Sequence, residues 1–264
     1  MNRTAIGALT VALGLSLAPA ALAQAVHLER VPGVFRDLMR SPQVVELPLE
    51  GDEEGLLLQI GFPFSYYGQT FTQFGVTTNG YVTFGTAVSP DNHPLPDAFL
   101  PNGVLAPFWD DLDSRPSPDS RVLMERTGDA GKRVLTIQWT QYALKADPAA
   151  RLTFQVLLFE GTNEVLFHYG TMKNGDGSEG TGRASGSSAT IGVESPDGSA
   201  AVPVSFEQTG VARAGLGYAF VPHAGAPLPE ARKLGDLDGD GRVTVLDQSR
   251  QVELTSPRYR PASA

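Results

Sequence analysis

The chain has 264 residues, 41% of them hydrophobic, with 29 Gly, 20 Pro and a formal net charge of −9. This length and composition favour one large β domain with appendages over two helical domains. An acidic chain without a basic run is a poor candidate for binding nucleic acid or anionic membranes, because nothing in it neutralises phosphate groups. The lack of Cys excludes disulfides, thiolate nucleophiles and Cys-type zinc sites.

Residues 1–23 have the pattern of a secretory signal peptide. Arg3 is the positive start, residues 5–17 are the apolar stretch, and Ala21-Leu22-Ala23 is the cleavage signal. The apolar stretch is too short to span a bilayer comfortably, and no second stretch of spanning length follows. We therefore expect cleavage before Gln24 and a mature protein that is secreted, held at the cell surface or located in the periplasm.

After a lead over residues 24–43, the sequence predicts short strands and turns. Residues 44–47 and 56–60 are apolar runs bounded by Pro and Gly. Residues 75–85 place Asn79-Gly80 between two alternating segments, which predicts a hairpin with a type I′ turn.

A Pro-rich loop over residues 86–102 precedes an apolar strand, and two more hairpins follow it. These pair residues 121–126 with 133–142, and residues 151–159 with 164–169. In the second strand of the first hairpin, the period of two separates two sets of side chains. One set is Leu135, Ile137 and Trp139, and the other is Val134, Thr136, Gln138 and Thr140. One apolar and one largely polar face are typical of an antiparallel sandwich.

The Gly/Ser-rich residues 170–188 predict a mobile loop, and residues 190–194, 202–206 and 217–221 predict the closing strands. The predicted fold class is all-β, an antiparallel, jelly-roll-like β-sandwich over residues 44–221. Pro-rich residues 222–234 predict a linker before a separate element at residues 235–264.

Residues 106–113 read Ala-Pro-Phe-Trp-Asp-Asp-Leu-Asp. This run resembles the Ala-Pro-Phe-Trp-x-Asp-x-Asp signature of nidogen-like extracellular domains. The upstream runs at residues 62–68, 78–81 and 84–85 resemble that family's pattern in the same order. The resemblance implies adhesion and matrix contact without catalysis.

Asp110, Asp111 and Asp113 leave three interpretations open: a second cation site, a catalytic carboxylate pair, or an acidic turn at a strand end. Because neighbouring side chains on a strand point to opposite faces, only Asp111 and Asp113 are expected to share a face. The sequence does not decide between these interpretations.

The most specific motif is a calcium loop over residues 236–247, which predicts bound Ca²⁺ and a short C-terminal helical element. Its predicted ligands, at loop positions 1, 3, 5, 7, 9 and 12, are Asp236, Asp238, Asp240, the carbonyl of Arg242, Thr244 and Asp247. Carboxylates this close repel one another unless a cation collects them, and Gly241 permits the sharp turn that brings them together.

This loop resembles one half of a dockerin repeat, and the resemblance implies a cohesin-type partner. Dockerins use two such repeats, whereas this chain has one, and Gln248 replaces the apolar residue usual after the last ligand. These departures bear on cohesin docking more than on calcium binding.

Other patterns predict little chemistry. Residues 175–180 match G-x-G-x-x-G without the strand and helix of a dinucleotide site, and the four His have no metal-ligand spacing. Trp109 and Trp139 lie in apolar strands, which favours core positions over sugar-stacking platforms.

The sequence therefore predicts a secreted, calcium-binding, non-catalytic adhesion protein with an extracellular protein or glycan partner. One alternative is a secreted carbohydrate-active enzyme or its glycan-binding accessory module. Another is a structural surface component assembled through the C-terminal loop.

Overall fold

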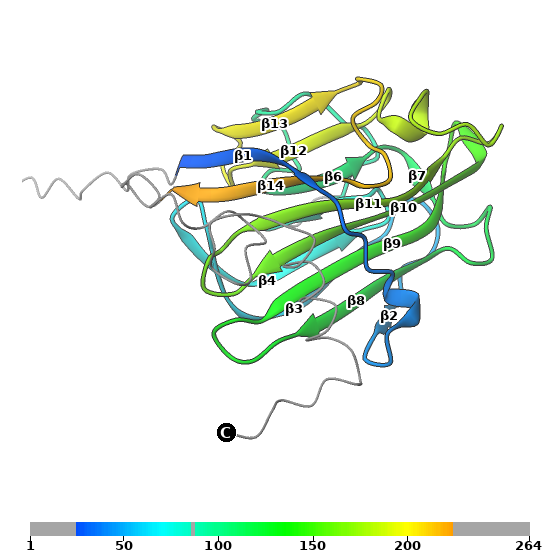
Figure 1. Ribbon diagram of the computed structural model, residues 1–264. Coiled ribbons are helices and arrows are strands. Elements are labelled where there is room, and N and C mark those ends of the chain that lie inside the picture. The colour runs from blue at the N-terminus through cyan, green and yellow to red at the C-terminus, as the bar shows by residue number, and fades with distance from the viewer. Residues whose placement is uncertain (1–24, 86–87, 224–264) are drawn as a thin grey trace, which may run out of the picture.

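The structure is a computed structural model that describes residues 25–85 and 88–223. Two antiparallel sheets pack face to face (Figure 1), which confirms the predicted all-β sandwich. The described helices are two short 3₁₀ turns, η1 (Leu38–Arg40) and η2 (Arg183–Ser185). Over these residues, no helix has the length and hydropathy needed to cross a membrane. The predicted helical element of the calcium loop lies outside the described residues.

The larger sheet, sheet A, has eight strands. In spatial order they are β1 (Ala25–Pro32), β14 (Leu216–His223), β11 (Val165–Lys173), β10 (Asp147–Phe159), β9 (Val134–Leu144), β8 (Arg121–Thr127) and β2 (Val45–Leu47), with β7 (Leu112–Asp113) paired to β9. Sheet B has six strands. They are β13 (Ala201–Phe206), β12 (Thr190–Glu194), β6 (Val104–Trp109), β5 (Val82–Thr83), β4 (Gln69–Thr77) and β3 (Gly55–Tyr66).

The main core lies between the sheets. Leu135, Ile137 and Trp139 of β9 all belong to it and are fully buried, as their shared face predicts. Trp139 stacks on Phe154 of β10 with ring centroids 5.1 Å apart, and its Nε1–H donates to the carbonyl of Thr77 at 2.8 Å. That hydrogen bond satisfies a buried indole and ties sheet A to sheet B.

The predicted hairpins are present as β8–β9, β10–β11 and β4–β5. The prediction of a type I′ turn at Asn79-Gly80 was wrong. Gly80 has φ +76°, but Asn79 is not among the described residues with positive φ. The connection runs from Thr77 to Tyr81, and the N–H of Thr77 donates to the carbonyl of Tyr81 at 3.1 Å. A longer connection therefore replaces the two-residue turn.

The sandwich starts earlier than the sequence predicts. Residues 24–43 were expected to be a lead, yet β1 pairs with β14 from Ala25↔His223 to Pro32↔Leu216. In β1, Val31 packs with Leu166 and Ala219 on the outer side of sheet A. Its strand pairing is with residues almost 200 positions away, which local sequence signals do not reveal.

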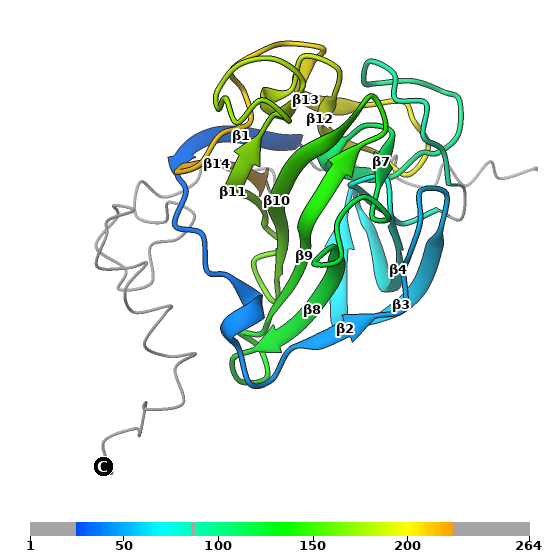
Figure 2. The same cartoon turned by 90° about the vertical axis from the view of Figure 1, so that its right-hand side faces the viewer.

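Residues 33–44, here called the strap, connect the two edges of sheet A across its outer face. The blue segment runs from β1 past β14, β11, β10, β9 and β8 to β2 (Figures 1 and 2). The polar face of β9 is therefore covered, and Gln138 is fully buried. Its Oε1 accepts hydrogen bonds from Leu38 N at 2.9 Å and Gln155 Nε2 at 2.6 Å, and its Nε2 donates to Asp37 at 2.9 Å.

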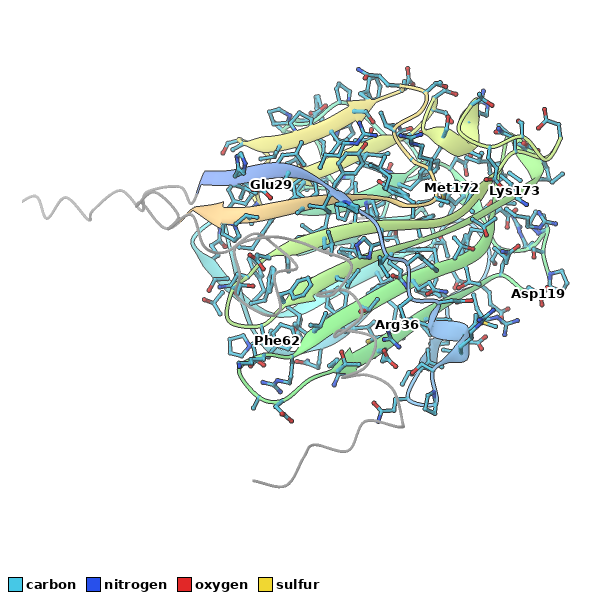
Figure 3. All side chains as sticks on the ribbon, in the orientation of Figure 1. Glu29, Arg36, Phe62, Asp119, Met172 and Lys173 are labelled. Carbon is cyan, nitrogen blue, oxygen red and sulfur yellow. The ribbon has the colours of Figure 1, made fainter. Side chains whose placement is uncertain are left out.

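An ion pair fixes the strap near η1. Arg36 lies against β8 beside η1 (Figure 3), where its guanidinium pairs with the buried carboxylate of Glu125, which also accepts from the hydroxyl of Ser41. The ring of Phe35 packs over Gly170, where a Cβ would be 3.0 Å from it. Polar groups on the outer face of sheet A are thus paired with the strap.

The Gly/Ser-rich segment after β11 was expected to be a mobile loop, but it has fixed contacts. Asn174 Nδ2 donates to the carbonyl of Thr181 at 2.8 Å, and its Oδ1 accepts from Ala184 N at 3.0 Å. Ala184 is fully buried in the main core. One internal asparagine and a buried alanine thus fix a segment whose composition alone predicts mobility.

Candidate functional site

The run at residues 104–113 passes through the middle of sheet B and ends at one end of the sandwich. In β6, Leu105 and Phe108 face the main core, whereas Trp109 lies on the outer face of the sheet. Trp109 is fully buried there beneath residues 88–102, the described part of the Pro-rich loop. Its Nε1–H donates to the carbonyl of Ser89 at 3.0 Å, and its ring meets His93 edge-on at 4.7 Å.

The connection between β4 and β5 docks directly on this run. A Cβ at Gly80 would lie 2.0 Å from the carbonyl oxygen of Phe108, so only glycine fits. Asn79 Oδ1 accepts from Leu112 N at 3.1 Å, and its carbonyl accepts from Asp110 N at 3.4 Å. These contacts give a physical reason for the two motifs to occur in one chain.

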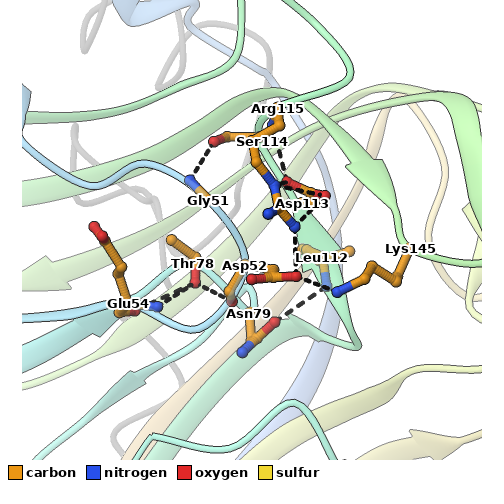
Figure 4. Close-up of polar contacts among 10 residues, drawn as sticks. All are labelled: Gly51, Asp52, Glu54, Thr78, Asn79, Leu112, Asp113, Ser114, Arg115 and Lys145. Atoms are coloured by element: carbon orange, nitrogen blue, oxygen red, sulfur yellow. Dashed lines mark hydrogen bonds and ion pairs between the residues drawn. The ribbon is translucent and has the colours of Figure 1, made fainter.

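Carboxylates from two distant segments meet at this end. We call Asp52, Glu53, Asp110, Asp111 and Asp113 the acidic end. Asp52 pairs with Arg115 at 2.6 Å and with Lys145, while Asp113 Oδ2 pairs with Arg115 at 2.8 Å (Figure 4). The hydrogen bond from Lys145 lowers the pKa of Asp52, and that from Arg115 lowers the pKa of Asp113. Two carboxylates of the acidic end are therefore neutralised.

Asp111 and Glu53 have no such direct ion pair among the described residues. Within the described residues, neither has a Lys or Arg nitrogen within 4.0 Å, and Asp111 Oδ1 is a buried atom without a hydrogen-bond partner. Desolvation, and after it the charge of Asp52, raises the pKa of Asp111, which Lys145 partly offsets. Desolvation, and after it the charges of Asp111 and Asp52, raise the pKa of Glu53, which Lys145 again partly offsets. The charge of Asp52 thus acts unfavourably on both carboxylates, and that of Asp111 on Glu53.

The carboxylate of Asp110 has different partners from those of Asp111 and Asp113. It is 7% exposed, accepts from the hydroxyl of Ser188 at 2.5 Å and from its neighbour's N–H at 2.9 Å. Burial raises its pKa to about 6, against the effect of these hydrogen bonds. Asp110 thus links β6 to the segment before β12.

Of the two predicted cation sites, one lies within the described residues and the other does not. In residues 25–85 and 88–223, no group of three His, Asp or Glu side chains is placed to hold a metal ion. Asp110, Asp111 and Asp113 are not brought together as ligands, since Asp113 pairs with Arg115 and Asp110 with Ser188. The predicted calcium ligands lie outside the described residues; they are Asp236, Asp238, Asp240, Arg242, Thr244 and Asp247.

A second carboxylate lies beneath the Pro-rich loop. Glu194 at the end of β12 is fully buried, its Oε1 accepts from Asp97 N at 2.7 Å, and its Oε2 has no hydrogen-bond partner. Burial raises the pKa of Glu194 to about 7, and the charges of Asp97 and Asp197 add to that effect. The hydrogen bond to Asp97 holds the tip of the loop against sheet B.

Basic residues are distributed unevenly between the two sheets. The six strands of sheet B contain no Lys or Arg, and neither do residues 41–114 or 184–212. Arg126 and Arg133 of sheet A approach sheet B at Gly61, in its edge strand β3. The acidic end and the Pro-rich loop are continuous in charge, since Asp91 of the loop acts on Asp111. Sheet B and its Pro-rich loop are therefore negatively charged.

Sequence reasoning found the aspartates of residues 110–113 but missed their neighbours. Asp52 and Glu53, between the predicted strands at residues 44–47 and 56–60, were not singled out, and neither were Lys145 and Arg115. One signal was available: the absence of Lys and Arg over residues 41–114, a stretch that includes Asp52, Glu53 and Asp111. The pairing of Asp113 with Arg115 depends on side-chain geometry that spacing does not supply.

The comparison with protein families matches the NIDO-related family over residues 28–219. Neither the curated proteins nor the solved structures yield a match. The matched range includes sheet B, the strap, the acidic end and all of sheet A except the first residues of β1 and the last residues of β14. Because the match covers more than half of the chain, the protein belongs to the NIDO-related family.

Proposed function

We propose that this protein is a secreted, non-catalytic binding or adhesion protein whose acidic end contacts a positively charged extracellular partner. Membership of the NIDO-related family supports an extracellular binding or adhesion-type module. The observation that carries the proposal is the pair Asp111 and Glu53, both with raised pKa and without an ion pair among the described residues.

The cost of this arrangement argues for a role in binding. Two carboxylates whose like charges are only partly offset by Lys145 destabilise the fold, and a positive group from a partner relieves the repulsion. The carboxylates stand on a sandwich whose turns are fixed by Asn79 and Gly80, so the partner meets a rigid surface. Such charge complementarity raises association rates and makes binding sensitive to salt.

Calcium is the second part of the proposal. The spacing of Asp236, Asp238, Asp240, Arg242, Thr244 and Asp247 supports one Ca²⁺ in the C-terminal segment. Calcium binding would order this segment and leave the NIDO-related domain unchanged. A cohesin-type partner is a further candidate for this segment, although dockerins contain two repeats.

Two features of the candidate sugar-binding residues weigh against the carbohydrate-active alternative. Trp109 and Trp139 are both fully buried and offer no stacking platform. Of Asp111 and Asp113, the two carboxylates expected to share a face, Asp113 is held in an ion pair with Arg115 at 2.8 Å. We therefore propose a role without catalysis.

A binding and activity panel tests the proposal. Residues 24–264 would be probed against arrayed extracellular proteins and glycans in 50 and 300 mM NaCl, and assayed for reducing-sugar release. We expect a protein ligand whose signal falls at high salt, and no sugar release. Sugar release that Asp110→Asn and Asp111→Asn abolish would instead establish an enzyme.

A further inference from the structure

The Pro-rich loop exposes two large apolar side chains at its tip. Phe99 is 78% exposed and Leu100 is 71% exposed, more than any other large hydrophobic side chain in the part of the chain that the structure describes. A solvated Phe-Leu pair is costly for a monomer, and such exposure is typical of contact sites.

The tip is held in place from below. Asp97 N donates to the buried Glu194 at 2.7 Å, and Asp97 Oδ1 accepts from Phe99 N at 2.9 Å. The turn at Gly198 closes the other side, where a Cβ would lie 2.4 Å from the carbonyl of Asp97. The loop thus presents Phe99 and Leu100 in a fixed conformation, which reduces the entropy lost on binding.

The base of the loop is attached to sheet B as well. Ser89 N donates to the hydroxyl of Tyr81 at 2.9 Å, and Asn92 Nδ2 donates to the carbonyl of Ser188 at 3.1 Å. The hydroxyl of Thr190 donates to the carbonyl of His93 at 2.8 Å. Anchors at both the base and the tip make the loop a rigid projection.

The charges around the tip limit what can cover it. Asp97 and Asp197 flank it, and the surrounding residues 41–114 and 184–212 contain no Lys or Arg. An anionic membrane would be repelled, and a symmetric contact between two copies would bring the same acidic faces together. A partner with Lys or Arg around an apolar pocket has neither problem.

We propose that the Phe99-Leu100 tip is the apolar anchor of a protein–protein contact, and that it inserts into a hydrophobic pocket of the partner bordered by Lys or Arg. The inference deepens the proposed function and rests on it, because it adds a central contact to the binding at the acidic end. On binding, the two side chains would become buried inside a ring of charged residues, and desolvated pockets of this kind are where binding energy concentrates.

Photo-crosslinking at the tip tests this. Residues 24–264 carrying Phe99→p-benzoylphenylalanine would be irradiated on cells of the source organism, with Val45→p-benzoylphenylalanine as the matched control. Val45 is 51% exposed on sheet A. We expect a discrete protein crosslinked from position 99 and not from position 45. The identified protein, once purified, should bind the unmodified chain and bind Phe99→Ser/Leu100→Ser about 10- to 100-fold more weakly.

The other outcomes overturn the inference. One is a crosslink to a second copy of the chain, and another is no crosslink from position 99. A third is sedimentation of the chain with phosphatidylcholine or phosphatidylglycerol vesicles, provided that Phe99→Ser/Leu100→Ser abolishes the sedimentation. A partner bound equally by Phe99→Ser/Leu100→Ser but weakly by Asp111→Asn/Glu53→Gln would refute the tip and preserve the proposed function. A partner whose binding neither pair of substitutions weakens would refute both.

Discussion

Gly80 lies so close to Phe108 that a Cβ on the glycine would be 2.0 Å from the phenylalanine's carbonyl oxygen. This contact joins the β4–β5 connection to the strand that leads into the acidic end. It also makes Gly80 a position where both space and its φ of +76° exclude other residues.

Gly80→Ala should therefore destabilise the domain by about 3 kcal/mol or more, because the backbone must move to accept the methyl group. Gly131→Ala is the matched control: Gly131 has φ +88° but nothing within 4 Å of its Cβ position. The control should lose about 1 kcal/mol from backbone strain alone. Urea unfolding measures both, and equal losses would refute the close contact.

Gln138 is the center of the contacts between the strap and sheet A. Gln138→Ala should lower the free energy of unfolding by about 2–3 kcal/mol, because it leaves the buried Leu38 N–H and the Gln155 amide with one partner fewer. Hydrogen exchange at Leu38 should accelerate at the same time. Gln73→Ala, at an exposed position in β4, should change stability by less than about 0.5 kcal/mol. Unchanged exchange at Leu38 would contradict the role given to the strap.

The sequence could predict which residues of β9 share a face, but not what covers each face. Leu135, Ile137 and Trp139 were placed correctly, because the period of two depends only on local backbone geometry. Gln138 reads as a solvent-facing residue, yet it is buried by a strap 100 residues away. β1 was missed for the same reason, since its pairing with β14 is entirely non-local.

The candidate site, like the fold, was only partly predictable from the sequence. The aspartates of residues 110–113 were visible as a motif, whereas the approach of Asp52 and Glu53 depends on the β2–β3 connection, which hydrogen bonds from Thr78 and to Ser114 hold at this end. Glu194 at the end of a strand gave no signal that the Pro-rich loop would bury it. Charges brought together by tertiary structure are not encoded in spacing.

Glu194 should make stability depend on pH. Its pKa of about 7 in the folded chain exceeds the unfolded value of about 4.3, so the protonated form is favoured by folding. This contribution is complete below about pH 4 and is lost as the pH rises to about 7. Glu194→Gln, which is neutral throughout, should gain up to about 2–3 kcal/mol over the original chain between pH 4.5 and pH 8. Chemical unfolding at both pH values measures the change, and a constant difference would show that Glu194 does not titrate on folding.

The predicted calcium loop should account for one binding site. Titration calorimetry on residues 24–264 should show one Ca²⁺ bound, and Asp236→Ala/Asp240→Ala should abolish it, because two of the predicted carboxylate ligands are lost. Asp119→Ala/Asp129→Ala removes two exposed acids elsewhere and should leave the site intact. A site that survives in the first variant would place calcium binding in another part of the chain. No heat at millimolar calcium would remove calcium from the proposed function.

Asp111→Asn/Glu53→Gln should raise the free energy of unfolding slightly, because it relieves the mutual repulsion of two carboxylates. Thermal unfolding in low salt checks the direction, and the gain should shrink as salt screens the charges. Asp119→Asn/Asp129→Asn, on the side of sheet A, is the matched control and should give no gain. A loss of stability would mean that these carboxylates support the fold rather than a contact.

The central claim, that the acidic end binds a positively charged extracellular partner, is tested most directly by the association rate of that partner. Surface plasmon resonance would compare the original chain with Asp111→Asn/Glu53→Gln and Asp119→Asn/Asp129→Asn in 50 and 300 mM NaCl. We predict that the first pair of substitutions slows association about tenfold in low salt and weakens its dependence on salt, while the second has little effect. Equal association rates for all three proteins at both salt concentrations would contradict the claim.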